Sequence, residues 1–147
     1  MLRLLLLAAG LAAAAQGQFT HIEVFMKDMN CVSCSESLGA SLKKVRGVDK
    51  VETNGEKGSV RLDLAKANRI SIEQVWDAIK RVGFTPGETK VSLRGAVKTE
   101  GSKTTIELPE SGKVYELEGA TKAGDVDLSG TTRPPPDPRT PIKISVN

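Results

Sequence analysis

Residues 20–93 carry the pattern that most constrains the fold, because two periodicities alternate along them. Apolar residues recur at every second position in short segments and at helical spacing in two longer ones. The resulting order, strand, helix, strand, strand, helix, strand, is that of a ferredoxin-like sandwich. Two helices on one face of a sheet bury their apolar stripes in two layers. We therefore predict an α+β unit in this half of the chain.

The two predicted helices are defined by their apolar spacing and by the residues that end them. The first spans roughly Val32 to Val45 and stops before Gly47. The second follows Ser71, which is placed to form a capping box with Gln74, and it ends before a glycine. The extended segments of this unit centre on residues 21–27, 48–51, 60–64 and 91–93.

The pattern changes after residue 93, where helical spacing gives way to short β-rich runs separated by Gly, Pro and charged turns. Many short strands indicate a small all-β unit, of which an OB-like barrel is one form. We expect its first strand to continue from the first unit, so that the two units pack together. The candidate strands are Val91–Thr99, Lys103–Leu108, Val114–Leu117, Val126–Ser129 and Ile142–Val146.

The first 17 residues have the composition of a secretory signal. Arg3 supplies a positive start, an apolar run follows, and small residues precede an expected cleavage before Gln18. The apolar run is shorter than the roughly 20 residues of a membrane span. We therefore expect an exported protein, periplasmic or secreted, with no stable membrane insertion after cleavage. The expected division is 1–17 for the signal peptide, 18–93 for the first domain and 94–147 for the β-rich domain.

The charge pattern argues against nucleic acid as a partner. The formal net charge is +3, with 12 Lys and Arg against 10 Asp and Glu in residues 19–93 and 8 against 8 in residues 94–147. Neither half has the one-signed field of a nucleic-acid or membrane-surface binder. Tyr115 is also the sole aromatic residue of the β-rich half, whereas single-strand binding uses several aromatic platforms.

Cys31 and Cys34 are the two cysteines of the chain, and they lie between the first predicted strand and the first predicted helix. Their spacing brings two sulfurs together on about one helical turn. The unpaired N–H groups and positive dipole end of a helix start favour deprotonated thiols. Soft thiolates bind soft ions, Cu(I) and Hg(II) foremost and also Zn(II). Two cysteines cannot form the disulfide framework of a small secreted protein.

Several short segments together resemble the heavy-metal-associated domain family over about residues 20–93. They are Met29-Asn30-Cys31-Val32-Ser33-Cys34, Gly47-Val48, Val60-Arg61-Leu62 and Gly83-Phe84. The family includes copper chaperones and periplasmic mercury-binding proteins. The resemblance implies that Cys31 and Cys34 bind a single ion and pass it to a donor or acceptor protein. It implies a monomeric carrier, not an enzyme, with Cu(I) as the expected ion and Hg(II) or Zn(II) as alternatives.

Three residues that the pattern places near the cysteines, and one histidine that lies apart from them, carry further expectations. The resemblance places Met29 beneath the loop as a packing residue. Phe84 either shields the site from water or packs at the helix end. Asp28 stands where the family usually has glycine, and Asp tolerates unusual backbone angles. His21 begins the first strand at the end away from the cysteines, so we expect a surface residue there.

Two other functions remain open from the sequence. A thioredoxin-type oxidoreductase uses the same cysteine spacing and helix-end electrostatics. A scaffold or interaction protein would instead work through the β-rich half, with a degenerate metal domain. Dithiol–disulfide exchange without metal distinguishes the first of these from a carrier. Metal binding after deletion of residues 94–147 distinguishes the second.

Overall fold

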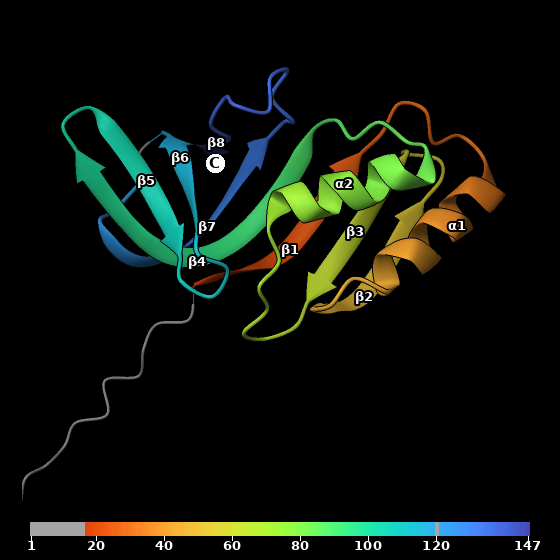
Figure 1. Cartoon of the computed structure of the whole chain (residues 1–147), viewed down its shortest axis with the longest axis horizontal. Helices are drawn as coiled ribbons and strands as arrows, with labels where there is room; N and C mark the ends of the chain where they lie inside the picture. Colours follow the sequence, from red (N-terminus) through yellow and green to blue (C-terminus); the bar gives the residue numbers. More distant parts are fainter. Residues whose placement is uncertain (1–16, 120) are drawn as a thin grey trace, which may run out of the picture.

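The computed structural model describes residues 17–119 and 121–147. Figure 1 shows two helices in front of one end of a long twisted sheet and a β-barrel at the other end. The expected signal peptide lies outside the described residues, apart from Gly17. The elements are β1 (Gln18–Phe25), α1 (Val32–Lys43), β2 (Val48–Asn54), β3 (Ser59–Leu64), α2 (Ile72–Val82), β4 (Thr89–Glu100), β5 (Lys103–Leu108), β6 (Lys113–Glu118), β7 (Gly124–Thr132) and β8 (Lys143–Val146).

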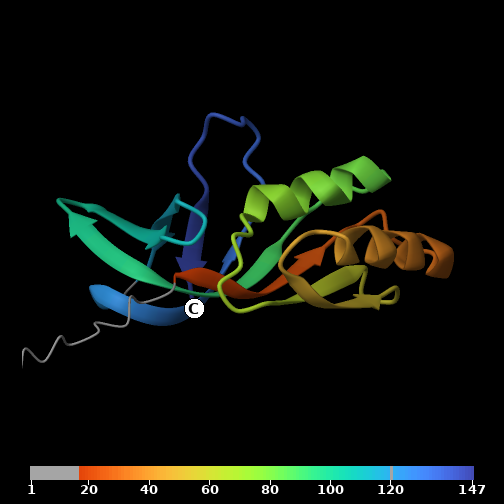
Figure 2. The same ribbon diagram turned by 60° about the horizontal axis from the view of Figure 1, so that its bottom comes forward.

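The first half is the predicted βαββαβ unit. Its four strands lie antiparallel in the order β2-β3-β1-β4. Alternate side chains of β1, including Ile22 and Val24, are buried, and both helices cover the same face (Figure 2). The second helix begins and ends as predicted. Ser71 and Gln74 form both hydrogen bonds of a capping box, and Gly83 ends α2 at a φ of 104°.

The second half is a five-stranded mixed barrel. Its strands follow one another in the order β4-β5-β6-β8-β7, and pairing of β7 with β4 closes the ring. The pair β6–β8 is parallel and the other pairs are antiparallel. The prediction of an α+β chain made of a ferredoxin-like unit and a small β-barrel is therefore confirmed.

The two halves share β4. One edge of this strand pairs with β1 as far as Arg94 and with β5 from Ala96 onward. Gly95 lies at the change of partner, and a Cβ there would lie 2.6 Å from the carbonyl oxygen of Glu107. The lack of a side chain thus permits the close approach that turns the sheet into the barrel. The expected domain boundary after Leu93 falls within this continuous strand.

Tyr115 of β6 joins the barrel to α2. Its ring packs edge-on against Phe19, with centroids 5.5 Å apart, and both side chains are buried. Its hydroxyl donates to Glu73 Oε2 at 2.9 Å and accepts the N–H of Ile72 at 3.2 Å. A single hydrophobic cluster runs through both halves. Within the described residues, no helix combines the length and the apolar character that a membrane span requires.

Removing the Tyr115 hydroxyl should change the free energy of unfolding by an amount that depends on pH. Burial, assisted by the Glu73 charge, raises the pKa of Tyr115 far above its ordinary value of 10.0. Above pH 10 the unfolded phenol loses its proton while the folded one keeps it. The free energy of unfolding then falls, by up to about 1.4 kcal/mol per pH unit. Tyr115→Phe lacks this loss and leaves the Ile72 N–H unpaired, which costs about 1–3 kcal/mol.

The stability difference between the parent protein and Tyr115→Phe should therefore shrink between pH 9 and pH 11. Urea unfolding at matched pH values measures it. The comparison cancels the titration of the lysines, which both proteins share. A difference that stays constant across this range would contradict the assignment of Tyr115.

Candidate metal site

The segment between β1 and α1 is hydrogen-bonded to the turn between β2 and β3. The N–H of Met26 donates to the carbonyl of Gly58 at 2.7 Å. Gly58 has a φ of +63°, and a Cβ at this position would lie 2.5 Å from the carbonyl oxygen of Met26. Only glycine fits both conditions without displacing the loop. Met29 is 2% exposed and belongs to the hydrophobic core, which supports its predicted packing role.

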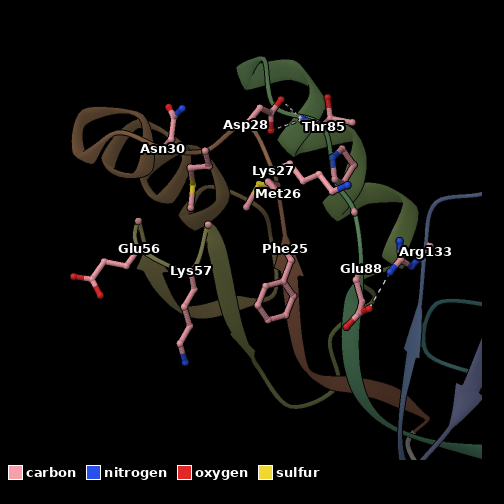
Figure 3. Close-up of a pocket in the computed structure, with 15 residues that line it drawn as sticks. Phe25, Met26, Lys27, Asp28, Asn30, Glu56, Lys57, Thr85, Glu88 and Arg133 are labelled. Atoms are coloured by element: carbon pink, nitrogen blue, oxygen red, sulfur yellow. Dashed lines mark hydrogen bonds and ion pairs between the residues drawn. The ribbon is translucent and has the colours of Figure 1, made fainter.

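The segment after α2 also forms hydrogen bonds with this loop. The N–H of Phe25 donates to the backbone carbonyl of Glu88 at 2.9 Å, and the N–H of Gly87 donates to the backbone carbonyl of Phe25 at 2.8 Å. The Asp28 carboxylate accepts the N–H of Thr85, with oxygens at 3.0 and 3.3 Å (Figure 3). Among the described residues, the one non-glycine residue with positive φ is Ala67, so Asp28 needs no special backbone angle. The Asp28 side chain instead links the cysteine loop to the segment after α2.

Removing this link has a measurable expected effect. Asp28→Ala should cost about 1 kcal/mol of unfolding free energy, because the Thr85 N–H loses a charged acceptor. Hydrogen exchange at the Thr85 amide should become faster. Glu56→Ala is the matched control, since it removes an exposed carboxylate beside the same loop. Equal effects of the two changes on Thr85 exchange would show that the hydrogen bond contributes nothing.

Cys31 and Cys34 both lie at the start of α1. Cys31 is the N-cap residue, with extended φ and ψ of −133° and 149°, and its sulfur accepts the N–H of Cys34 at 3.1 Å. The two cysteines are joined by a disulfide, with their Cα atoms 5.2 Å apart. The first turn of α1 contains no acidic side chain, so nothing there offsets the positive helix end.

The residues between the cysteines face solvent. Val32 is 74% exposed, and Ser33 lies on the surface with its hydroxyl 3.6 Å from the Cys31 sulfur. Cys31 and Cys34 are themselves partly exposed. The pair is therefore accessible to another protein, and both sulfurs come from one helical turn. Reduced, such a pair offers two soft ligands side by side.

A hollow of about 560 Å³ lies beside the loop (Figure 3). Phe25, Met26 and Asp28 line one side of it, and Glu88 and Arg133 line another. Arg133 belongs to the loop after β7 and donates to Glu88 at 3.1 Å. The loop after β7 therefore contributes a charged residue to the hollow, beside Glu88 and across from Asn30, which the sequence pattern did not predict. No periodicity relates residues so far apart in the chain.

Phe84 and His21 are two further residues that the sequence pattern singled out. Phe84 is half-buried and packs against the core. His21 is partly exposed, and its Nδ1 lies 2.7 Å from Asp63 Oδ1. That hydrogen bond lowers the pKa of Asp63 below its ordinary value. Within residues 17–119 and 121–147, no group of three or more His, Cys, Asp or Glu side chains is arranged to hold a metal ion.

Several known proteins are similar to this chain over its first half. Residues 23–85 match the heavy-metal-associated domain. The copper chaperone CopZ of Staphylococcus haemolyticus (strain JCSC1435) is 34% identical over 59 residues, which are 40% of this chain and 85% of that protein. Oxidized MerP from Ralstonia metallidurans CH34 is 20% identical at a TM-score of 0.43, covering 47% of this chain and 94% of its own.

A copper binding domain from HMA7, a P-type ATPase, is 25% identical at a TM-score of 0.43, and the alignment covers 49% of this chain and 92% of that domain. The similarity to CopZ establishes the family of this chain, because the sequence identity exceeds 30% over most of the length of CopZ. The family match over residues 23–85 includes Cys31 and Cys34 and runs from the end of β1 through α2, and the barrel remains unassigned. This chain therefore belongs to the heavy-metal-associated domain family.

Proposed function

We propose that the protein carries one soft metal ion, with Cu(I) as its main cargo, between Cys31 and Cys34, and passes it to a partner protein. The observation that supports this most is the placement of both sulfurs on one exposed turn at an unneutralised helix start. The helix end and the Cys34 N–H both favour a thiolate at Cys31. The relationship to copper chaperones supports Cu(I) over Hg(II) and Zn(II).

Transfer would follow from a low ligand count. Two thiolates leave a near-linear ion open to an incoming thiolate, whereas four-coordinate zinc sites are closed. The ion can then move by stepwise ligand exchange without release into solution, and no catalytic residue is required. Reduction of the disulfide to two thiols must precede loading, because a disulfide sulfur is not a thiolate ligand.

We propose that the carrier works outside the cytoplasm. The apolar start of the sequence supports export to the periplasm or beyond. We place the metal site in residues 18–93, and residues 94–147 form a β-rich part that shares β4 and the hydrophobic core with it. The partners are a metal donor and an acceptor protein, and the carrier acts as a monomer.

An anaerobic titration of the reduced protein with Cu(I), against a competing chelator, tests the proposal. We expect tight binding at one ion per chain, with weaker binding of Zn(II) in the same assay. Hg(II) is the second soft ion to compare. No competitive binding of any of the three ions would refute the carrier function.

A second candidate function, thiol–disulfide exchange, is favoured by the disulfide between Cys31 and Cys34 on an accessible turn. An insulin-reduction assay without metal tests it. A carrier should leave insulin reduction at the rate of the uncatalysed thiol reaction. Turnover of insulin without metal would instead favour an oxidoreductase.

A further inference from the structure

The open face of the sheet carries an imidazole and a carboxylate that are separate from the cysteine pair. His21 and Glu23 are two residues apart on β1, so both point to the face that α1 and α2 leave uncovered (Figure 2). Both line a hollow of about 240 Å³. Cys31 and Cys34 do not line it, and α1 starts beyond the opposite end of β1.

Asp63 fixes the orientation of the His21 ring. It lies directly across from His21 on β3, and its Oδ1 is 2.7 Å from Nδ1. An ionised carboxylate only accepts hydrogen bonds, so Nδ1 carries a proton, and the neutral form of the imidazole has its lone pair on Nε2. Metal-binding histidines typically have their second ring nitrogen held this way. The His21 side chain is 46% exposed, which leaves it accessible to an ion.

Glu23 is available as a second ligand. Arg61 and Lys90 lie opposite it on the two neighbouring strands. Arg61 instead donates to Asp63 at 3.4 Å, and the Lys90 ammonium lies 5.2 Å from the centroid of the Phe25 ring. Among the described residues, neither cation forms an ion pair with Glu23. Its carboxylate therefore remains free on the same face as the imidazole.

We propose that His21 Nε2 and the Glu23 carboxylate bind a divalent borderline cation, with Cu(II) bound most tightly and water completing its coordination. Imidazole and carboxylate suit Cu(II) and Zn(II), and Cu(II) stands highest in the affinity order of divalent ions. Cu(I) prefers the thiolates, so the two sites differ in the oxidation state of copper that they take. This proposal does not depend on the carrier function, because it uses neither cysteine.

Pulsed electron paramagnetic resonance of the full chain, with both cysteines changed to serine and one equivalent of Cu(II), tests the site. His21 is the single histidine of the sequence, so any imidazole nitrogen coupling reports on it. We expect coupling from one imidazole, lost in His21→Gln. Absence of imidazole coupling in the parent would overturn the proposal, since the ion would then lie elsewhere.

The Cu(II) affinities of further variants distinguish a residue that binds the ion from one that orients the His21 ring. Glu23→Gln should weaken Cu(II) binding at least about tenfold while keeping the imidazole signal. Asp63→Asn, which removes an outer partner of the ligand, should weaken it by about 10–100-fold. Glu52→Gln, an exposed carboxylate on β2, is the matched control and should change nothing. Equal affinities for Glu23→Gln and Glu52→Gln would exclude Glu23 as a ligand.

Discussion

Cys31→Ser is expected to abolish tight Cu(I) binding while leaving the protein folded. A hydroxyl is a poor ligand for Cu(I), and loss of even an outer partner of a ligand costs about 10–100-fold. We therefore expect Cu(I) affinity to fall at least about a thousandfold in a chelator competition. Serine is a preferred N-cap, so its oxygen can accept the Cys34 N–H, and the free energy of unfolding should differ from that of the reduced parent protein by less than about 1 kcal/mol.

Two further variants separate the metal ligand from the helix cap. Cys31→Ala removes both, and it should cost about 1 kcal/mol more stability than Cys31→Ser with the same loss of Cu(I). Ser33→Ala keeps both thiols and is the control for changes in the exposed turn. Retention of stoichiometric Cu(I) binding by Cys31→Ser, measured in the same competition, would remove the proposed site.

Phe19→Ala is expected to produce the largest loss of stability. Phe19 is fully buried at the junction of the two halves, where its ring packs on Tyr115. Truncation of a buried Phe costs about 3–5 kcal/mol, part of it from the cavity left behind. Because the core is continuous and β4 is shared, both halves should unfold in one transition at a lower urea concentration.

Urea unfolding followed by two probes measures this effect. Trp76 fluorescence reports on α2, and the amide signals of β5 and β6 report on the barrel. Val114→Ala is the control, because Val114 is 57% exposed and should change stability by less than about 0.5 kcal/mol. Separate transitions for the two probes in Phe19→Ala would contradict a shared core.

Local chemistry made much of the fold predictable. Ser71 and Gly83 bound α2 because capping and left-handed glycine depend on nearby residues alone. The first helix ends at Lys43, two residues before the predicted Val45. There the Lys44 N–H bonds Ser41 and the Val45 N–H bonds Leu42, at the shorter spacing of a tightened last turn.

Non-local pairing limited the prediction of the barrel. The sequence predicted β7 over Val126–Ser129, but the strand runs from Gly124 to Thr132. Its polar ends lack an apolar alternation and are extended because they pair with β4. The parallel pair of β6 with β8 likewise has no signal in local periodicity. Strand existence was thus predictable, whereas closure of the barrel was not.

The candidate site shows the same division. Cys31 and Cys34 were predicted together from spacing and from the family pattern, and the structure places them on one turn. The role of Asp28 was not predicted, because its partner Thr85 is 57 residues away in the sequence. The position of Arg133 in the hollow depends on how the barrel packs.

X-ray absorption at the copper edge of the Cu(I)-loaded, reduced protein tests the central claim most directly. We expect two sulfur neighbours for one copper ion per chain, and loss of that environment in Cys34→Ser. Nitrogen or oxygen neighbours in the parent protein, or an unchanged sulfur environment in Cys34→Ser, would contradict a carrier site formed by Cys31 and Cys34.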